Sequence, residues 1–302
     1  MNSLDPMIPD LARTIHVVGD QHHGSLAASR KALLEAGLAQ PLTRWINDRV
    51  AACLHMGDLT NNATDAEDNL YVAHRGHYGD APLHAILGNH DIRSNRNPEE
   101  HAAALGLPGS MWTAEIERMG VTIVGVLPGT DTAAHNSGSQ FTSERLARLD
   151  STLAGIDGDV WIACHFPMHD TVNGSASDPA IRKRSVTSGY YVATTGATSN
   201  SNAVLEMLDD HSNVKAWLSA HIHADLTADR LLTTVSTGSR GIAHINTGAV
   251  APLEVAQSPR SQINTFYLTK VEGGIEVRVR GHHAGGYWES IGGRRVTLVP
   301  TS

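Results

Sequence analysis

The chain has 302 residues, 41% of them hydrophobic, and a formal net charge of −8 at pH 7. A chain of this length can build a full hydrophobic core in one large domain. The acidic balance argues against a protein that holds nucleic acid through a broad basic surface, but it does not exclude an anionic substrate, because a bound metal ion can invert the local charge.

Residues 1–12 are expected to form an N-terminal tail ahead of a single domain over residues 13–302. The tail contains acids and prolines and lacks the apolar core of a signal peptide. No apolar stretch in the chain approaches the length of a membrane span. The two cysteines, Cys53 and Cys164, lie in apolar runs, which favours buried thiols over a disulfide. These features predict a cytoplasmic protein without membrane contact, and they leave its oligomeric state open.

Apolar runs alternate with helical patterns in the first part of the chain. The runs TIHVVGD, AACLHMGD and LHAILGNHD predict three strands. A helix is expected over residues 25–37, and a second helix is expected to begin at Thr64, which has capping-box spacing to Glu67.

The middle of the chain adds hairpin signals to this alternation. MWTAEIERMGVTIVGVLP predicts a hairpin around Met119-Gly120, and SERLARLDSTLAG predicts a helix with Ser143 as its N-cap. DVWIACHFP and VKAWLSAHIH predict strands, with a helix at VLEMLDD between them. Alternating strands and helices followed by hairpins indicate one α/β domain with a mixed sheet.

Two further segments have a character of their own. Residues 170–198 are polar, rich in Gly, Ser and Thr, and without periodicity. Because long loops in compact domains are often functional, we expect part of this loop to cover a cleft and to help select a substrate. The C-terminal segment, 255–302, is expected to be mostly β, with a hairpin that turns at Gly273-Gly274.

Five predicted strands are followed by carboxylate, amide or imidazole groups. In α/β sheets, ligands bind beyond the carboxyl ends of the strands. Imidazole and carboxylate without thiolate suit Mn, Fe, Zn or Ni better than Ca or Mg. In chain order the groups are Asp20 with His22, Asp58, Asn89 with His90 and Asp91, His165, and His221 with His223.

The tetrapeptide GNHD at positions 88–91 is the most informative of these motifs, because adjacent Asn, His and Asp on a turn have no packing purpose. The ordered set D-x-H, G-D, G-N-H-D, H-x-P and H-x-H resembles the calcineurin-like metallophosphoesterase family, over roughly Thr14 to Asp225. In motif pattern it is most similar to the class III cyclic nucleotide phosphodiesterase-like members. The resemblance implies an α/β fold of two mixed β-sheets packed face to face with flanking helices, and a metal site at the C-terminal ends of the strands.

The resemblance also implies a site for two divalent or mixed-valence transition metal ions. Asp58 would bridge the two ions, which would generate a hydroxide between them. His90 would protonate or stabilise the departing oxygen, and Asp91 would accept a hydrogen bond from the other nitrogen of His90. The first ion would be held by Asp20, His22 and His223, and the second by Asn89, His165 and His221.

Two positions depart from the family pattern. Ala220 replaces the glycine that usually begins the last motif, and Phe166 stands where the fourth motif often has a second histidine. We expect the alanine to alter the turn slightly and the phenylalanine to make one wall of the pocket more apolar.

The choice of substrate rests on which branches the motifs resemble. GDLTNNA and ILGNHD lack the arginines of the protein Ser/Thr phosphatases, and Asn61 replaces the metal-binding tyrosine of purple acid phosphatases. The acidic balance counts against the DNA-repair nucleases. The pattern therefore favours hydrolysis of a small phosphodiester, such as a cyclic nucleotide. A phosphomonoesterase with the same site and an inactive scaffold of the same fold remain open.

Overall fold

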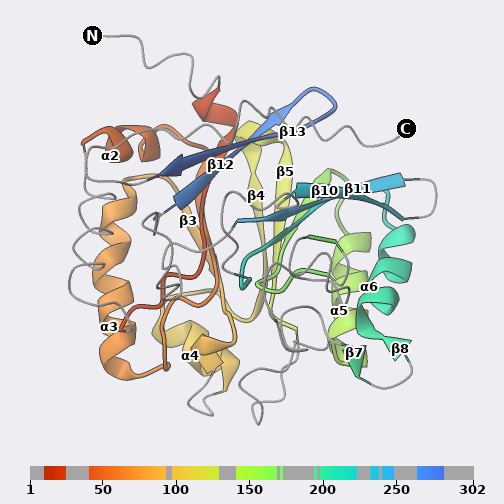
Figure 1. Cartoon of the computed structure of the whole chain (residues 1–302), viewed down its shortest axis with the longest axis horizontal. Coiled ribbons are helices and arrows are strands. Elements are labelled where there is room, and N and C mark those ends of the chain that lie inside the picture. Colours follow the sequence, from red (N-terminus) through yellow and green to blue (C-terminus); the bar gives the residue numbers. More distant parts are fainter. Residues whose placement is uncertain are drawn as a thin grey trace, which may run out of the picture.

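Two mixed β-sheets form the centre of the computed structural model (Figure 1). The structure describes residues 10–24, 41–92, 97–128, 141–168, 171–172, 194–195, 198–222, 232–237, 240–247 and 264–281. The first sheet has the strand order β13-β12-β1-β2-β3, and the second has the order β10-β11-β9-β6-β5-β4. The predicted α/β fold of two mixed sheets is thus confirmed.

In the first sheet, three parallel strands carry an antiparallel hairpin at one edge. In the second, the strands β5, β6, β9 and β11 are parallel, and β4 and β10 are antiparallel edge strands. The strands of the first sheet are β1 (Thr14–Val18), β2 (Ala52–Met56), β3 (Leu83–Ile86), β12 (Asn264–Val271) and β13 (Gly274–Gly281). Those of the second are β4 (Met111–Ile116), β5 (Val121–Val126), β6 (Asp159–Ala163), β9 (Val214–Ser219), β10 (Leu232–Thr237) and β11 (Arg240–Asn246). A separate pair consists of β7 (Thr194–Thr195) and β8 (Thr198–Ser199).

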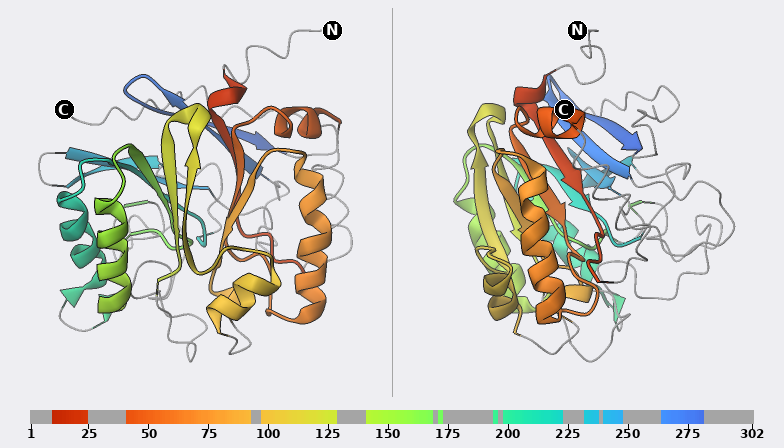
Figure 2. Two further views of the ribbon diagram at one scale, coloured as in Figure 1. Left: turned by 180° about the vertical axis from the view of Figure 1, so that it is seen from behind. Right: turned by 90° about the vertical axis from the view of Figure 1, so that its left-hand side faces the viewer.

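Helices cover the outer faces of the two sheets (Figures 1 and 2). One buried cluster fills the space between the sheets and includes Val17, Leu54 and Phe266 of the first and Ile123 and Trp161 of the second. Central strands such as β1 and β2 are buried along their whole length because both of their faces are covered. The described helices are α2 (Pro41–Asn47), α3 (Asp65–His74), α4 (Pro98–Ala104), α5 (Ser143–Ala154) and α6 (Asn200–Asp209), with short 3₁₀ turns η1 (Leu11–Arg13), η2 (Arg75–Tyr78), η3 (His90–Ile92) and η4 (Glu117–Met119).

The local signals in the sequence hold with small shifts. The capping box of α3 is present, with Thr64 as N-cap and Glu67 as its reciprocal partner. The N-cap of α5 is Thr142 and not Ser143, because the Thr142 hydroxyl accepts from the amide of Arg145. The final hairpin turns one residue earlier than expected, since Val271 pairs with Gly274 across the turn. The helix expected over residues 25–37 lies outside the described residues.

Both cysteines are buried free thiols, as predicted. Burial raises the pKa of each of them to about 12, which keeps them protonated and unreactive at neutral pH. In the part of the chain that the structure describes, no helix combines the length and the apolarity that crossing a bilayer requires.

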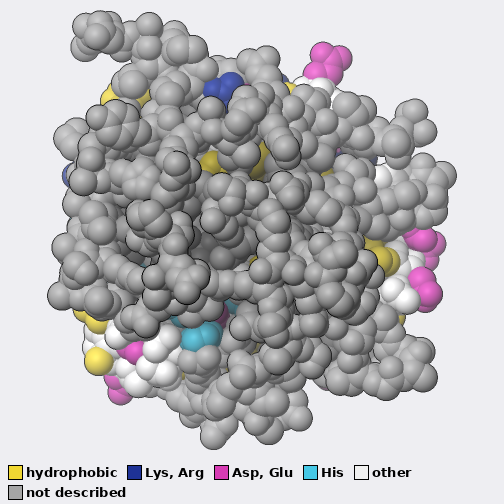
Figure 3. Space-filling model, viewed as in Figure 1, with side chains coloured by type: hydrophobic (Ala, Val, Ile, Leu, Met, Phe, Trp, Pro, Cys, Tyr) yellow, Lys and Arg dark blue, Asp and Glu magenta, His cyan; other side chains and the backbone are white. Residues whose placement is uncertain are grey.

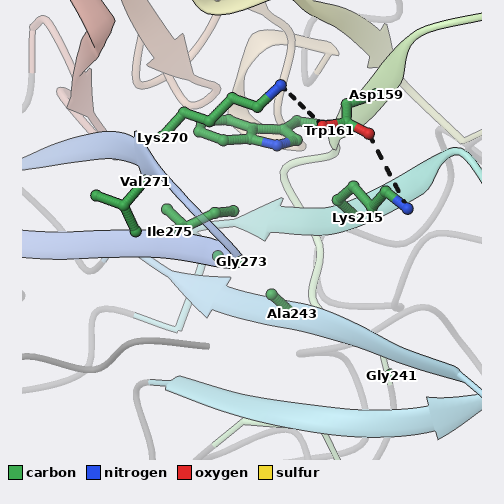
Figure 4. Close-up of a pocket in the computed structure, with 10 residues that line it drawn as sticks. Asp159, Trp161, Lys215, Gly241, Ala243, Lys270, Val271, Gly273 and Ile275 are labelled. Atoms are coloured by element: carbon green, nitrogen blue, oxygen red, sulfur yellow. Dashed lines mark ion pairs between the residues drawn. The ribbon is translucent and has the colours of Figure 1, made fainter. Parts of the chain in front are cut away.

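A cavity of about 170 Å³ opens between the sheets where β6 begins (Figure 4). Trp161 and Ile275 line it, and Lys270 pairs with Asp159 at its edge at 2.8 Å. It lies at the start of β6, whereas His165 follows the end of that strand, so it is separate from the predicted site.

One buried histidine makes the fold sensitive to acid. His244 in β11 is 1% exposed, and neither of its ring nitrogens has a hydrogen-bond partner among the described residues. Burial therefore lowers its pKa to about 3.

Replacing His244 by leucine should reduce the loss of stability in acid. Below about pH 6.5 the unfolded chain takes up a proton at this residue that the folded chain does not, so the contribution of neutral His244 is present above pH 6.5 and is lost as the pH falls toward 3. Between pH 7.5 and pH 5 we expect His244→Leu to lose about 2 kcal/mol less unfolding free energy than the unaltered protein. Chemical denaturation at both pH values measures this difference, and equal losses in the two proteins would contradict the assignment.

Candidate metal centre

The loops that follow β1, β2, β3, β6 and β9 bring the predicted site residues together. Eight of the nine predicted residues lie in the described part of the chain, and His223 lies outside it. Figure 3 shows histidine side chains grouped at one place on the face of the molecule that is seen in Figure 1.

The carboxylate of Asp58 lies at the middle of this group. Its Oδ2 is 3.3 Å from Nε2 of His165, 3.6 Å from Nε2 of His22 and 3.9 Å from Nε2 of His90. Asp58 belongs to two groups of three residues that could hold a metal ion. One is His22, Asp58 and His90, and the other is Asp58, His165 and His221. Within each group the ligand atoms lie within 4.8 Å of one another. A carboxylate has two oxygens, so one residue can serve two metal ions.

Asp20 connects the two sheets at the centre. It is fully buried, and its Oδ1 is 3.9 Å from Nε2 of both His22 and His165. Its Oδ2 accepts a hydrogen bond from the backbone amide of His221 at 3.0 Å. One carboxylate therefore faces the imidazoles and also fixes the loop that carries His221.

The side chain of Asn89 adds a neutral oxygen. Its Oδ1 is buried and has no hydrogen-bond partner among the described residues. A buried carbonyl without a partner costs free energy unless something binds it, and metal coordination would satisfy it. The donor set of carboxylate, amide and imidazole thus fits two first-row transition metal ions.

The backbone at the centre is strained. Among the described residues, five that are not glycine have positive φ, and four of these are predicted metal ligands: Asp20 (49°), His22 (45°), Asp58 (49°) and His221 (65°). Such conformations cost of order 1–3 kcal/mol each and cluster at functional sites. In the last motif the left-handed residue is His221, and Ala220 does not have positive φ, which explains why alanine is accepted in place of the usual glycine.

Two glycines allow the loops to approach one another. Gly57 has a φ of 87°, and a Cβ there would lie 2.7 Å from Nδ1 of His165. At Gly88 a Cβ would overlap both the backbone nitrogen and Oδ1 of Asp58. The GD and GNHD motifs need their glycines because Asp58 and His165 lie directly against these backbones.

The charges at the centre depend on one another. Burial alone would raise the pKa of Asp58, but the imidazoles of His165, His90 and His22 hold it well below its usual range. Burial alone would lower the pKa of His165, but Asp58 and Asp20 raise it to about 9. The carboxylate of Asp58 is therefore ionised and is stabilised by positive charge beside it.

His90 is oriented differently from the prediction. Its Nδ1 donates a hydrogen bond to the backbone carbonyl of Asn61 at 2.8 Å, and not to Asp91. A neutral carbonyl fixes the ring without adding negative charge, and Nε2 remains 3.9 Å from Oδ2 of Asp58.

Asp91 ties the strand-end loops together, so the predicted hydrogen bond between it and His90 is wrong. Its Oδ1 accepts from the amide and hydroxyl of Thr60, and its Oδ2 accepts from the amides of Leu59 and Gly88. Burial and the charge of Asp58 raise the pKa of Asp91 to about 7, against the effect of these hydrogen bonds. The residue fixes the position of Asp58 relative to Asn89.

Several partners of the site are invisible to motif analysis. His165 donates from Nδ1 to the carbonyl of Met56 at 2.7 Å, and His90 donates to the carbonyl of Asn61. Backbone carbonyls are common to all residues, so no residue type signals them. The hydroxyl of Thr60, two residues after Asp58, is the one side-chain signal that could have been noticed.

Comparison with known proteins now identifies the family. The sequence profile of the calcineurin-like phosphoesterases matches residues 13–225. The chain belongs to the calcineurin-like phosphoesterase family. With this donor set, membership indicates a metal-dependent phosphoester hydrolase.

Solved structures match this chain at low sequence identity. A dimetal phosphatase from Danio rerio is 16% identical, with 91% of this chain and 98% of that chain covered and a TM-score of 0.60. Vps29 from Chaetomium thermophilum is 11% identical, with 92% and 95% covered and a TM-score of 0.41. No curated protein sequence matches significantly.

Replacing Gly88 by alanine should disturb the centre through the backbone of Asp58. We expect a loss of roughly 1–3 kcal/mol in unfolding free energy and a lower content of bound metal, because the new methyl group displaces a proposed ligand. Gly76→Ala is the control, since a Cβ at Gly76 meets no atom within 4 Å. Denaturation curves, together with metal analysis after incubation with Mn²⁺ and desalting, test this. Equal metal contents in the two variants would contradict it.

Proposed function

We propose that this protein is a dinuclear metal-dependent phosphodiesterase that hydrolyses a cyclic nucleotide or another small organic phosphodiester. The observation that carries the proposal is the position of Asp58, whose carboxylate belongs to both groups of potential ligands. A carboxylate shared in this way is what a two-metal hydrolase requires between its ions.

Each ion would have its own set of protein groups. Asp20, His22 and His223 would hold the first ion, Asn89, His165 and His221 the second, and Asp58 both. Bound metal ions would supply positive charge to the phosphoester and lower the pKa of a coordinated water. The ionised carboxylate of Asp58 and the strained backbone of the loops support these assignments.

His90 is the proposed proton donor to the departing oxygen. Its side chain is 18% exposed, whereas that of His165 is fully buried, so His90 can meet a substrate at the edge of the centre. The carbonyl of Asn61 accepts from Nδ1, so we assign the proton transfer to Nε2, which lies 3.9 Å from Oδ2 of Asp58. Asp91 would act through Gly88 and Thr60 as a positioning residue.

The preference for a diester follows from charge. A phosphomonoester carries nearly two negative charges at neutral pH and a diester carries one. The GDLTNNA and ILGNHD motifs lack the arginines with which the protein phosphatases of the family meet a phosphate. A diester needs fewer cationic partners than a monoester, so it suits a site that lacks these arginines.

The substrate class can be tested with two nitrophenyl esters. In the presence of Mn²⁺ we expect a higher kcat/KM for bis(p-nitrophenyl) phosphate than for p-nitrophenyl phosphate, and a chelator should abolish both activities. The reverse order would favour the phosphomonoesterase. Metal binding without hydrolysis of either ester, with Mn²⁺, Fe²⁺, Zn²⁺ or Ni²⁺, would indicate a scaffold.

Replacing His90 by alanine separates metal binding from proton transfer. His90 is not a proposed ligand, so His90→Ala should keep both metal ions. Hydrolysis of a diester with a poor leaving group should fall about 10²–10⁴-fold, the usual contribution of general acid catalysis. The loss should be smaller for an activated nitrophenolate, which leaves without protonation.

The control for this variant is His77→Ala, which removes a half-buried histidine of η2. A loss of metal in His90→Ala alone would instead make His90 a ligand in the group with His22 and Asp58. Equal losses for both leaving groups would argue against a role in protonation.

The predicted role of residues 170–198 in substrate selection lies outside the described residues, apart from 171–172, 194–195 and Thr198.

A further inference from the structure

Phe166 lies directly behind two proposed ligands of the second metal ion. It is fully buried and belongs to the apolar cluster on the helix-covered side of the second sheet. The sequence led us to expect Phe166 in one wall of the pocket. Because it is fully buried, it does not line an open pocket. Its ring centroid is 5.1 Å from that of His165 and 4.8 Å from that of His221.

These three rings form a closed triangle. The two imidazole centroids are 4.9 Å apart, so all three sides are of similar length. The Phe166 ring meets His165 nearly edge-on, at 84°, and His221 at 53°. Edge-to-face and tilted contacts at these distances are the preferred arrangements of aromatic rings.

The backbone around the triangle is held in place. Phe166 accepts a hydrogen bond at its carbonyl from the indole nitrogen of Trp217 at 3.1 Å. His165 accepts at its carbonyl from the amide of Ala220 at 3.0 Å. The backbone of His165 and Phe166 is therefore linked both to β9, through Trp217, and to the loop that follows β9, through Ala220.

The two imidazoles need this support because their nitrogens must converge. Nε2 of His165 and Nδ1 of His221 are 3.1 Å apart. Two nitrogens that each lie about 2.0–2.1 Å from one ion are about 3.0–3.4 Å apart, so this separation suits two ligands of one metal. The torsion that turns an imidazole is broad, so neighbouring groups must fix the ring.

We propose that Phe166 is a positioning residue for the second metal ion, and that its ring holds His165 and His221 so that their nitrogens face the same point. This inference rests on the proposed two-metal site. It gives a chemical role to a residue that departs from the more common histidine at this position. Groups that orient metal ligands typically contribute 10–100-fold to metal affinity.

The alternative is that Phe166 only fills space in the core. The two hypotheses predict different metal affinities for Phe166→Leu. This variant keeps an apolar side chain but removes the flat ring that contacts both imidazoles. Phe141→Leu is a matched control, because Phe141 is 4% exposed, lies in the same cluster and contacts Trp217 at a centroid distance of 6.3 Å. Both variants lose aromatic packing, which Phe166 makes against two proposed ligands and Phe141 makes against Trp217.

The experiment measures stepwise binding of Mn²⁺ by titration calorimetry, with metal content measured after dialysis in graded metal buffers. His165→Ala identifies the binding step that belongs to the second ion, because it removes a proposed ligand of that ion. In Phe166→Leu we expect this step to weaken about tenfold and the other step to stay unchanged. In Phe141→Leu both steps should match those of the unaltered protein, even where its Tm falls as far.

Phe166→Met is a second variant, for which a flexible chain fills the same space, and the same selective loss is expected. Equal affinities in Phe166→Leu and Phe141→Leu at similar Tm, or equal weakening of both binding steps, would overturn the positioning role. A single Mn²⁺ binding step in the unaltered protein would mean that it binds only one ion, and the two-metal proposal itself would fail. The absorption spectrum of Co²⁺ in the second site gives an independent readout, since it shifts with ligand geometry and not with core packing elsewhere.

Discussion

The buried charge of Asp58 is the constraint around which the centre is built. An ionised carboxylate at 1% exposure is stable only if positive charge lies beside it. Three imidazoles provide such charge when protonated, and they lie at 3.3, 3.6 and 3.9 Å from one of its oxygens. The same attraction stabilises the protonated form of His165, because Asp58 and Asp20 raise its pKa to about 9. A metal ion held by these residues would supply this positive charge without a proton.

Holding these groups together has a conformational cost that the surrounding structure offsets. Four proposed ligands adopt left-handed backbone conformations at the ends of buried strands. Asp91 compensates by accepting four hydrogen bonds from the loops that carry Asp58 and Asn89. Gly57 and Gly88 remove the side chains that would keep the loops apart. The hydrogen bonds of Asp91 and the two glycines thus hold the loops in the strained conformations that bring the proposed ligands together.

The sequence predicts the parts of the centre that depend on residue type. Strand-end motifs located the residues that the structure brings together, because metals select carboxylate, amide and imidazole, and apolar runs located the strands that carry them. It could not predict that His90 would donate to the carbonyl of Asn61, or that Asp91 would serve Thr60 and Gly88 instead. The Asn61 carbonyl and Thr60 lie 29 and 31 residues from His90 and Asp91 in the chain, and they meet these residues only when β2 and β3 pair. Gly88 is three residues from Asp91, but its bond to the carboxylate depends on how the turn folds. The shift from Ser143 to Thr142 at the start of α5 has a local origin, because both hydroxyl residues suit an N-cap.

The centre also couples the two sheets. Asp20 and Asp58 follow strands of the first sheet, and His165 and His221 follow strands of the second. Hydrogen bonds cross between the sheets from His221 to Asp20 and from His165 to the carbonyl of Met56. The spacing of the ligands is therefore set by the apolar cluster between the sheets, which is closely packed and resists compression. We therefore expect a change of volume in that cluster to alter the distance between the proposed ligands of the two sheets.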